Sequence, residues 1–327
     1  MVKTIFAFIN AAIIQAIPLL YGATGEIITE KSGNLNLGIP GIMYMGGISG
    51  IIGGYLYEHS VANPSAILCV LIPLCASLLG STFLALIYSF LTITLRVNQN
   101  VTGLALTTFG IGIGNFFGGS LLKFFGETGS ISLIETGKAF KKSLPFAHKL
   151  GIIGDTFLSF GFLAYLAIII AVVASIFLNK TRAGLNLRAV GENPATADAA
   201  GINVTKYKYL STLIGGAIAG LGGLYFVMDY TGGAWTNNGF GDRGWLAVAI
   251  VIFAIWRPAM AILSSFLFGG LYILSIYIPG LSGSTKELIN MLPYVVTILV
   301  LVIISMRKKR ENQPPAHLGL SYFREER

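Results

Sequence analysis

Charge is the first thing that this chain has little of. Of its 327 residues, 11% are charged and 54% are hydrophobic, and the mean hydropathy is +0.75. Soluble domains carry charge at about a quarter of their positions. The shortage of charge therefore excludes an ordinary water-soluble domain and indicates a chain that crosses a membrane several times.

Cysteine and histidine are scarce as well. Cys69 and Cys75 lie in one apolar stretch, where thiols pack as small hydrophobic groups, so no disulfide framework is expected. His59, His148 and His317 are far apart in sequence, and neither an HExxH motif nor a paired Cys/His spacing is present, so we expect no metal site. The chain also has no GxxxxGKS or GxxxxGKT phosphate loop, which argues against ATP hydrolysis by this chain.

Long apolar stretches are what the chain has instead. A helix needs about 20 apolar residues to cross a bilayer. Candidate crossings lie near residues 4–23, 37–57, 66–94, 99–122, 155–178, 207–228, 241–256, 259–279 and 288–306. The first follows only Lys3 and runs on without a clear cleavage site, which favours a retained helix over a removed signal peptide. We predict an all-α polytopic bundle of roughly eight to ten crossings in two pseudo-related halves, with a membrane domain over residues 1–306.

The net charge of +8 comes from basic residues in the loops and the tail. In a membrane protein such residues are enriched on the cytoplasmic side, so they do not indicate nucleic acid binding. The basic tail, residues 307–327, begins with Arg307, Lys308, Lys309 and Arg310 and is assigned to the cytoplasm. Beyond these residues it becomes polar and contains proline, which predicts a short flexible extension.

Two hydrophilic loops compete for the cytoplasmic side. Residues 123–154 and residues 179–208 each carry five basic and two acidic side chains. Four apolar windows separate the second loop from the tail, and this even number places both on the same side. The first loop should then be external, where its mixed lysine and apolar residues would form an amphipathic surface helix, either a lid or a receiver for a binding protein. The side of the amino terminus stays open, because window 241–256 is short and begins with Asp242 and Arg243.

A polar segment broken by glycine and proline, Gly33 to Gly47, runs directly into an apolar one. In lipid, a broken helix is tolerated only where protein or a water-filled cavity satisfies its backbone, so this segment is a candidate pathway element. An ordinary loop between helices is the alternative. Thr231 to Trp245 has the same character, and paired interrupted segments in the two halves point to a transport site.

Side chains that can replace the hydration shell of a polar solute are found in and near these segments. Asparagine can donate and accept hydrogen bonds at once, and aromatic rings can stack on a flat solute. The candidate pathway residues are Asn36, Gly38, Asn98, Asn100, Asn238, Phe240 and Trp245. For the two aromatic residues, anchoring at the membrane interface is the alternative.

Glycines recur at helical spacing in three apolar stretches. They are Gly46, Gly50 and Gly54; Gly110, Gly114 and Gly118; and Gly216 with Gly220. Stripes of small residues allow helices to approach closely in a membrane, so we expect these positions to pack helices together.

The second hydrophilic loop predicts a short, sharply bounded helix. Asn193 suits the N-cap, Pro194 the first turn, and Gly201 the left-handed position that ends a helix. Its small side chains would allow close docking into a groove of another protein. A surface helix that only connects two membrane segments is the alternative.

Three segments carry a family resemblance. LRAVGENPATADAAGI, Leu187 to Ile202, resembles the cytoplasmic coupling loop of bacterial ABC-importer permeases of the branched-chain amino acid, ribose and simple-sugar group. GEIITEKSGNLNLGIPGIMYMGG, Gly25 to Gly47, and the stretch Phe240 to Gly270 are similar to the early and late signatures of the nucleoside subgroup, which works with a basic membrane lipoprotein. One departure is Pro40, where the subgroup commonly has an acidic residue.

The resemblance implies a type II importer permease in the bacterial plasma (inner) membrane. Such a permease is not an enzyme and has no cofactor of its own: a separate cytoplasmic ATPase hydrolyses ATP with Mg²⁺, a lipoprotein delivers the nucleoside, and a second, related permease completes a heterodimer or, less commonly, a homodimer. The coupling loop would span residues 179–206, with Arg188, Glu192, Asn193, Pro194, Ala195, Asp198 and Gly201 as its ATPase contacts. Arg188 and Glu192 are also spaced to pair with each other instead.

Other functions predict different features. Simple sugars are the alternative substrates within the class. A self-sufficient carrier or channel would need ionisable residues in the membrane, and apart from Glu26, Glu30, Asp242 and Arg243 near window ends these are scarce. A membrane enzyme would need clustered His, Asp or Cys residues in the apolar windows, and the sequence has no such cluster.

Overall fold

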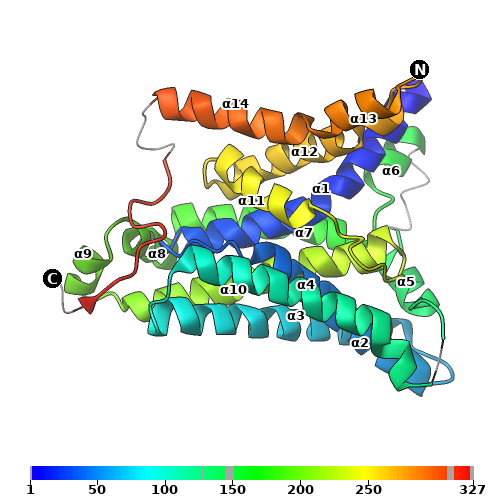
Figure 1. The fold of residues 1–327 in the computed structure, drawn as a ribbon, viewed down its shortest axis with the longest axis horizontal. Coiled ribbons are helices and arrows are strands. Elements are labelled where there is room, and N and C mark those ends of the chain that lie inside the picture. The colour runs from blue at the N-terminus through cyan, green and yellow to red at the C-terminus, as the bar shows by residue number, and fades with distance from the viewer. Residues whose placement is uncertain (1, 127, 144–150, 308–312, 325–327) are drawn as a thin grey trace.

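The computed structural model describes residues 2–126, 128–143, 151–307 and 313–324 of the chain (Figure 1). His148 and the basic run Lys308 to Arg310 fall outside the described residues. All regular elements in the described ranges are helices, which confirms the predicted all-α membrane fold. An isolated β-bridge joins Ser132 to Ala234.

Eight helical stretches are long and apolar enough to cross a membrane within the described residues. They are Thr4–Glu30, Ile39–Ser60, Ala66–Thr94, Gln99–Phe124, Phe162–Lys180, Val204–Tyr230, Pro258–Tyr277 and Gly283–Ile303. The long helices that form them are α1 (Val2–Glu30), α2 (Ile39–Ser60), α3 (Ala66–Ser89), α4 (Gln99–Phe124), α7 (Phe162–Lys180), α10 (Val204–Tyr225), α12 (Pro258–Tyr277) and the pair α13 (Gly283–Asn290) and α14 (Leu292–Arg307). α3 and α10 continue into π-helical turns, Phe90–Thr94 and Phe226–Tyr230.

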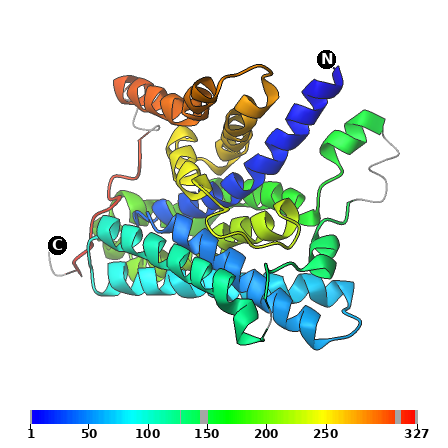
Figure 2. The ribbon, with the colours of Figure 1, turned by 45° about the vertical axis from the view of Figure 1, so that its right-hand side comes forward.

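The short helices lie at the two ends of the bundle or inside it. α8 (Arg182–Glu192) and α9 (Pro194–Ala199) lie at the end that also holds the carboxyl-terminal segment, here called the α8–α9 end (Figure 1). α5 (Ile134–Phe140) and α6 (Gly151–Phe157) lie at the opposite end, the α5–α6 end, as does the amino terminus (Figure 2). The structure thus places the amino terminus opposite α8 and α9, a point that the sequence left open.

The crossing that contains α11 (Arg243–Phe253) is only partly helical. Eleven helical residues span about 16 Å, roughly half of a bilayer core. Residues 231–242 supply the rest of this crossing by entering from the α5–α6 end as an irregular segment. Window 241–256 is therefore half of a crossing, and the even number of passes between α8 and the tail is kept.

One predicted boundary is wrong. The window 155–178 was expected to be a single span, but α6 ends at Phe157 and the spanning helix α7 begins only at Phe162. Gly161 allows the separation, because its missing side chain leaves room for the Phe140 carbonyl O, which would lie 2.3 Å from a Cβ. The chain between the two helices therefore turns against α5 and does not extend α7.

Close helix packing depends on glycine. A Cβ on Gly46 of α2 would lie 2.4 Å from the carbonyl O of Gly220 in α10, and a Cβ on Gly110 of α4 would lie 2.4 Å from the carbonyl O of Gly41. The backbones of these helix pairs touch directly at these points. Such contact is a means of helix association in lipid, where the hydrophobic effect gives little.

The remaining glycines of the three stripes lie against neighbouring side chains. Gly50 faces Leu224, Gly54 faces Leu133, Gly114 faces Tyr44, Gly118 faces the Trp235 indole and Gly216 faces Ala85.

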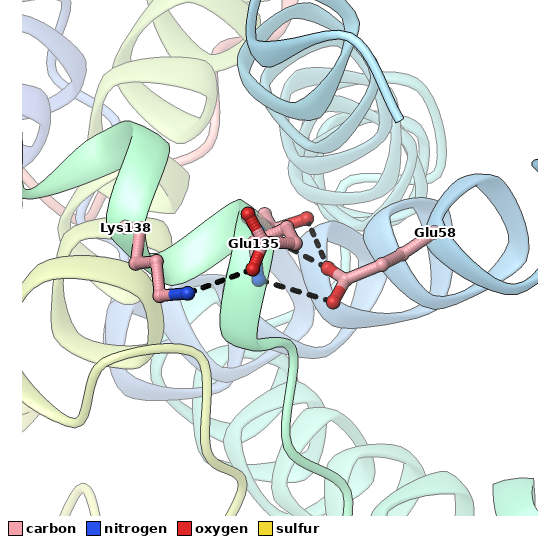
Figure 3. Close-up of polar contacts among 4 residues, drawn as sticks. Glu58, Glu135 and Lys138 are labelled. Atoms are coloured by element: carbon pink, nitrogen blue, oxygen red, sulfur yellow. Dashed lines mark hydrogen bonds and ion pairs between the residues drawn. The ribbon is translucent and has the colours of Figure 1, made fainter. Parts of the chain in front are cut away.

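α5 is fixed to the end of α2 through one carboxylate. Glu58 accepts hydrogen bonds from the backbone N–H groups of Glu135 and Thr136, both at 3.1 Å, and from the Thr136 hydroxyl at 2.8 Å (Figure 3). A negative charge at the start of a helix also suits its dipole. Lys138 pairs with Glu135 at 2.8 Å on the same short helix. The external loop of the sequence prediction is therefore docked onto the bundle at this point.

Candidate functional site

The first of two interruptions, residues 31–38 between α1 and α2, is called the first break. Asn34 and Asn36 within it are completely buried. The N–H of Asn36 donates to Glu26 Oε1 at 3.0 Å, and the N–H of Leu35 donates to Gln99 Oε1 at 2.7 Å. Side chains of α1 and α4 thus satisfy backbone donors that the broken helix leaves free, as a nonaqueous environment requires.

Carbonyl groups of the first break are satisfied in the same way. The Tyr88 hydroxyl donates to the carbonyl O of Leu35, and the Thr107 hydroxyl donates to that of Leu37 at 2.7 Å. Asn36 itself accepts from the N–H of Gly38 at 2.9 Å. The first break is therefore a braced element inside the protein, and the side chain of Asn36 serves this bracing.

Asn98 and Asn100 lie apart from the other candidate pathway residues. Asn98 is the N-cap of α4, where its side chain accepts from the N–H of Val101 at 3.1 Å. Both asparagines are exposed at the α8–α9 end. The neighbouring Gln99, which the sequence reasoning did not select, is the residue that reaches the first break.

The second break, residues 231–242, enters the bundle between α2 and α4. Trp235 packs on Gly114 and Gly118, and its Nε1–H donates to Asn237 Oδ1 at 2.9 Å.

Phe240 lies further along the second break and is buried. Its ring centroid is 5.6 Å from the ring centroid of Tyr44 and 4.9 Å from that of Phe226. The cavity beside these rings has a volume of about 10 Å³, room for no more than about one water molecule. The bundle is closed at this point.

Arg243 follows the second break and is 6% exposed. Its Nε and Nη2 groups donate to Gln15 Oε1 at 3.1 and 3.0 Å, and Nη1 donates to the carbonyl O of Phe240 at 2.9 Å. The guanidinium also lies 4.8 Å from the ring centroids of Phe226 and Tyr272. Carbonyl oxygens and aromatic faces therefore compensate this buried charge.

The two breaks meet where α2 and α11 begin. A Cβ on Gly244 would lie 2.6 Å from Pro40 Cα, so the first turns of the two helices are in contact. α1 joins the other ends: Glu26 holds the first break, and the Glu30 carboxylate accepts from the indole N–H of Trp256 just after α11. The order helix, break, helix thus occurs as α1–α2 and again as α10–α11, in opposite directions across the bundle (Figure 1).

A polar face lies on the open side of α4 and the second break. We define this polar face by Thr108, Gly112, Asn115, Asn237 and Asn238, which are exposed or half-buried. Asn115 and Asn238 exchange hydrogen bonds: Asn115 Nδ2 donates to Asn238 Oδ1 at 2.8 Å, and the N–H of Asn238 donates to Asn115 Oδ1 at 3.2 Å. Amide groups exposed within a span are costly in lipid, so this face borders water or another protein.

Sequence reasoning found only part of the polar face. It selected Asn238, but not Asn115, which lies among apolar residues of α4; the predicted pathway residue Trp245 is half-buried and is not part of this face as defined. The sequence did not indicate Gly112 as part of this face either. In the structure it faces open space, because no atom lies within 4 Å of a Cβ placed at this position. The contact between Asn115 and Asn238 joins residues 123 positions apart, so local pattern does not indicate it.

The short helix expected after Asn193 is present as α9. Asn193 accepts from the N–H of Thr196 at 3.0 Å, and Gly201 has a φ of +81° beyond the end of the helix.

The side chains of α9 differ in exposure. Pro194 and Ala197 are buried, Ala195 and Asp198 are half-buried, and Thr196 is exposed. Any docking surface on α9 is therefore its Asn193, Thr196 and Ala199 side.

Arg188 and Glu192 on α8 are not paired with each other. Glu192 accepts from the N–H of Ala316 in the tail at 3.4 Å, and Arg188 borders a cavity of about 590 Å³ together with Lys31 and Arg257. Burial lowers the pKa of Lys31; Glu192 opposes this shift, whereas the positive charges of Arg188 and Arg257 add to it.

Residues 313–324, here called the tail strap, bind back onto the α8–α9 end. The N–H of His317 donates to the carbonyl O of Gly191 at 3.0 Å, and that of Gly319 donates to the carbonyl O of Gly33 at 3.2 Å. Tyr322 donates its hydroxyl hydrogen to Asp198 Oδ2 at 2.9 Å. The prediction of a flexible extension is wrong for these residues, because their backbone is hydrogen-bonded to α8 and to the first break.

The helical bundle, its two interrupted crossings and the helix pair at one end are those of a membrane permease. The chain belongs to the family described as "Branched-chain amino acid transport system / permease component", whose model matches residues 8–301. This match covers nearly the whole described bundle, including both breaks and α8 and α9.

Relatives of known name agree with the family. The chain is 31% identical over 306 residues to the nucleoside ABC transporter permease protein NupC of Lactococcus lactis subsp. cremoris, covering 92% of this chain and 93% of the relative. It is 29% identical to the guanosine ABC transporter permease protein NupQ of Bacillus subtilis, with 92% of both chains covered. It is also 32% identical to the putative glucose ABC transporter permease protein TsgC13 of Haloferax volcanii, with 97% of both covered. The chain is thus a multi-span ABC permease.

Proposed function

We propose that this permease imports nucleosides across the bacterial plasma membrane, driven by a separate ATPase subunit that hydrolyses ATP with Mg²⁺. The names of two relatives that align over nearly the whole chain support a nucleoside substrate. A sugar substrate is the alternative, supported by the putative glucose permease. The observation that carries the proposal is the polar face. Its amide donors and acceptors, from Asn115 in the span Gln99–Phe124 and from Asn238 in the second break, suit a solute rich in hydroxyl and ring nitrogen groups.

The α8–α9 end faces the cytoplasm in this proposal. Basic side chains gather there, with Lys31, Arg188 and Arg257 around one cavity and Arg96, Lys206 and Arg324 around another. The tail then lies in the cytoplasm, while α5 and α6 face outward. There α5, which is fixed to the end of α2, would form part of the surface that binds the substrate-binding lipoprotein.

The coupling surface for the ATPase is α8 and α9. It includes the predicted contacts Arg188, Glu192, Asn193, Pro194, Ala195, Asp198 and Gly201. Because Pro194 is buried and Asp198 is held by the tail strap, the exposed Asn193 and Thr196 would enter the groove of the ATPase. Movement of α8 would pass through the Gly191–His317 and Gly33–Gly319 contacts to the first break.

A second, related permease would cover the polar face and complete the path. Asn115, Asn238 and Trp245 would line it, with Phe240 closing it toward Tyr44. Asn36 and Gly38 would act indirectly, by holding the start of α2, and Asn98 and Asn100 would lie at the cytoplasmic mouth.

Uptake by proteoliposomes tests the substrate. The permease is reconstituted with its ATPase, its second permease and its lipoprotein, and labelled guanosine is supplied with and without excess ribose or glucose. We expect ATP-dependent guanosine uptake that neither sugar reduces. Full competition by a sugar would reassign the substrate, and uptake without the ATPase would show a self-sufficient carrier.

A substitution on the exposed side of α9 tests coupling. Thr196→Arg places a bulky charge where the ATPase would dock, so ATP-stimulated uptake should be lost while the permease still inserts and folds. Lys180→Gln is the matched control, because it changes an exposed residue at the end of α7 that lies in the predicted coupling loop but is not one of its proposed ATPase contacts. Normal uptake by Thr196→Arg would remove the coupling role from this surface.

A further inference from the structure

A cavity of about 770 Å³ lies between the π-helical turn Phe90–Thr94, the start of α10 and the tail strap. Basic side chains dominate its charged lining: Arg96, Lys206, Lys208 and Arg324. Asp198 is the single carboxylate among the described residues that line it, and this carboxylate already binds Arg324 Nε at 3.2 Å and the Tyr322 hydroxyl at 2.9 Å. The described lining of the cavity therefore carries an excess of positive charge.

Lys208 is the residue that requires an explanation. It is 3% exposed and lines the cavity, and its ammonium group has no hydrogen bond or ion pair within the described parts of the chain. The backbone carbonyl O of Lys208 accepts from the hydroxyls of Ser211 and Thr212. These bonds involve the backbone and do not compensate the charge of the ammonium group. An unpaired ammonium group on a buried residue is costly, whereas a bound anion would compensate it. His317, a titratable residue close enough to feel this charge, is no anion: burial and the charge of Lys208 together lower the pKa of His317.

The start of α10 adds donors to the same cavity. Asn203 caps the helix by accepting from the N–H of Lys206 at 2.9 Å, while the N–H groups of Val204 and Thr205 have no acceptor in the part of the chain that the structure describes. All these residues line the cavity. Free N–H groups and the positive end of a 22-residue helix favour phosphate and related anions.

We propose that this cavity binds a phosphate group, held by Lys208, by the first N–H groups of α10 and by Lys206 at the rim. The phosphate belongs either to a soluble anion or to an acidic lipid headgroup of the adjacent leaflet. Bound there, it bridges α10, the end of α9 and the tail strap, because all three contribute to the wall of the cavity. The proposal does not depend on the identity of the transported solute.

Thermal unfolding of the full-length permease tests the site. In phosphatidylcholine nanodiscs, sodium phosphate is titrated against sodium chloride at equal ionic strength. We expect phosphate to raise the unfolding midpoint of the wild type and of Lys180→Gln. In Lys208→Met, which keeps the length of the side chain but removes its charge, the apparent affinity should fall about tenfold or more, because charge-assisted hydrogen bonds are lost.

A lipid arm separates the two sources. The same midpoints are measured in nanodiscs of equal parts phosphatidylcholine and phosphatidylglycerol, and bound phosphatidylglycerol is counted by native mass spectrometry. A Lys208-dependent response to phosphate identifies a soluble anion, and a Lys208-dependent response only to phosphatidylglycerol identifies a lipid. If Lys208→Met does not fold, Lys206→Gln, which changes an exposed residue of the same cavity, replaces it. No response of the wild type to either ligand, or equal responses of wild type and variant, would overturn the proposal.

Discussion

The N–H of Asn36 donates to Glu26 Oε1 at 3.0 Å, so a fully buried carboxylate of α1 holds the backbone of the first break. The same helix holds the end of α11 through Glu30 and Trp256. The acidic residues near this span end therefore support the interrupted helices, a role that requires no coupling ion.

Removal of this carboxylate should destabilise the permease. Glu26→Ala leaves the buried N–H of Asn36 without an acceptor, which costs about 1–3 kcal/mol. Glu26→Gln keeps an acceptor oxygen and should cost less. Thermal unfolding in detergent measures both, and equal stability of Glu26→Ala and wild type would show that the first break finds another acceptor.

The contact between α2 and α10 predicts a sharp effect of one methyl group. Gly46→Ala places a Cβ 2.4 Å from the Gly220 carbonyl O, so the helices must separate, at a cost of about 1–3 kcal/mol. Gly112→Ala is the matched control in another span, because nothing lies within 4 Å of its Cβ. The two variants are compared by thermal unfolding and by yield of folded protein. Similar stability of both would contradict direct backbone contact at Gly46.

The polar face predicts loss of transport without loss of folding. Asn115→Leu removes both hydrogen bonds to Asn238 and makes the face apolar, so guanosine uptake should fall about tenfold, the effect of one or two lost hydrogen bonds.

Asn238→Gly is the informative companion to that variant. The backbone of Asn238 has a φ of +56°, which glycine adopts without strain, so the variant tests the side chain alone. Its uptake should fall as well, with an unchanged unfolding midpoint. If both variants transport normally, the path lies elsewhere.

The tail strap predicts a change in the efficiency of coupling. Tyr322→Phe removes the hydrogen bond to Asp198 and loosens the strap by about 0.5–1.5 kcal/mol. We expect the partner ATPase to continue hydrolysis while less solute enters per ATP. The ratio of labelled solute taken up to phosphate released measures this, with Tyr57→Phe at the opposite end as control. An unchanged ratio would show that the strap plays no part in coupling.

Local sequence signals predicted the elements whose causes are local. Asn193, Pro194 and Gly201 define α9 because capping and a left-handed C-terminal residue act within a few positions. The first break was recognisable from its polar residues, glycines and proline for the same reason. Apolar length likewise predicted the long spans, although it did not separate α6 from α7.

Features that depend on distant partners were not predictable in this way. Arg243 is buried because Gln15, 228 positions away, accepts from it, and Asn115 becomes part of the polar face only through Asn238. The tail strap is held in place by hydrogen bonds to Gly33, Gly191 and Asp198. Its own polar sequence does not indicate these partners. Each of these contacts exists only once the bundle has formed.

The path of the tail strap has a practical consequence for protein production. A fusion partner joined directly after Arg324 would start next to Asp198, which Arg324 binds, and close to the exposed side of α9. An affinity tag there would crowd the surface offered to the ATPase and pull on a segment that contacts the first break. A tag on the amino end, at the far side of the bundle, leaves that machinery untouched.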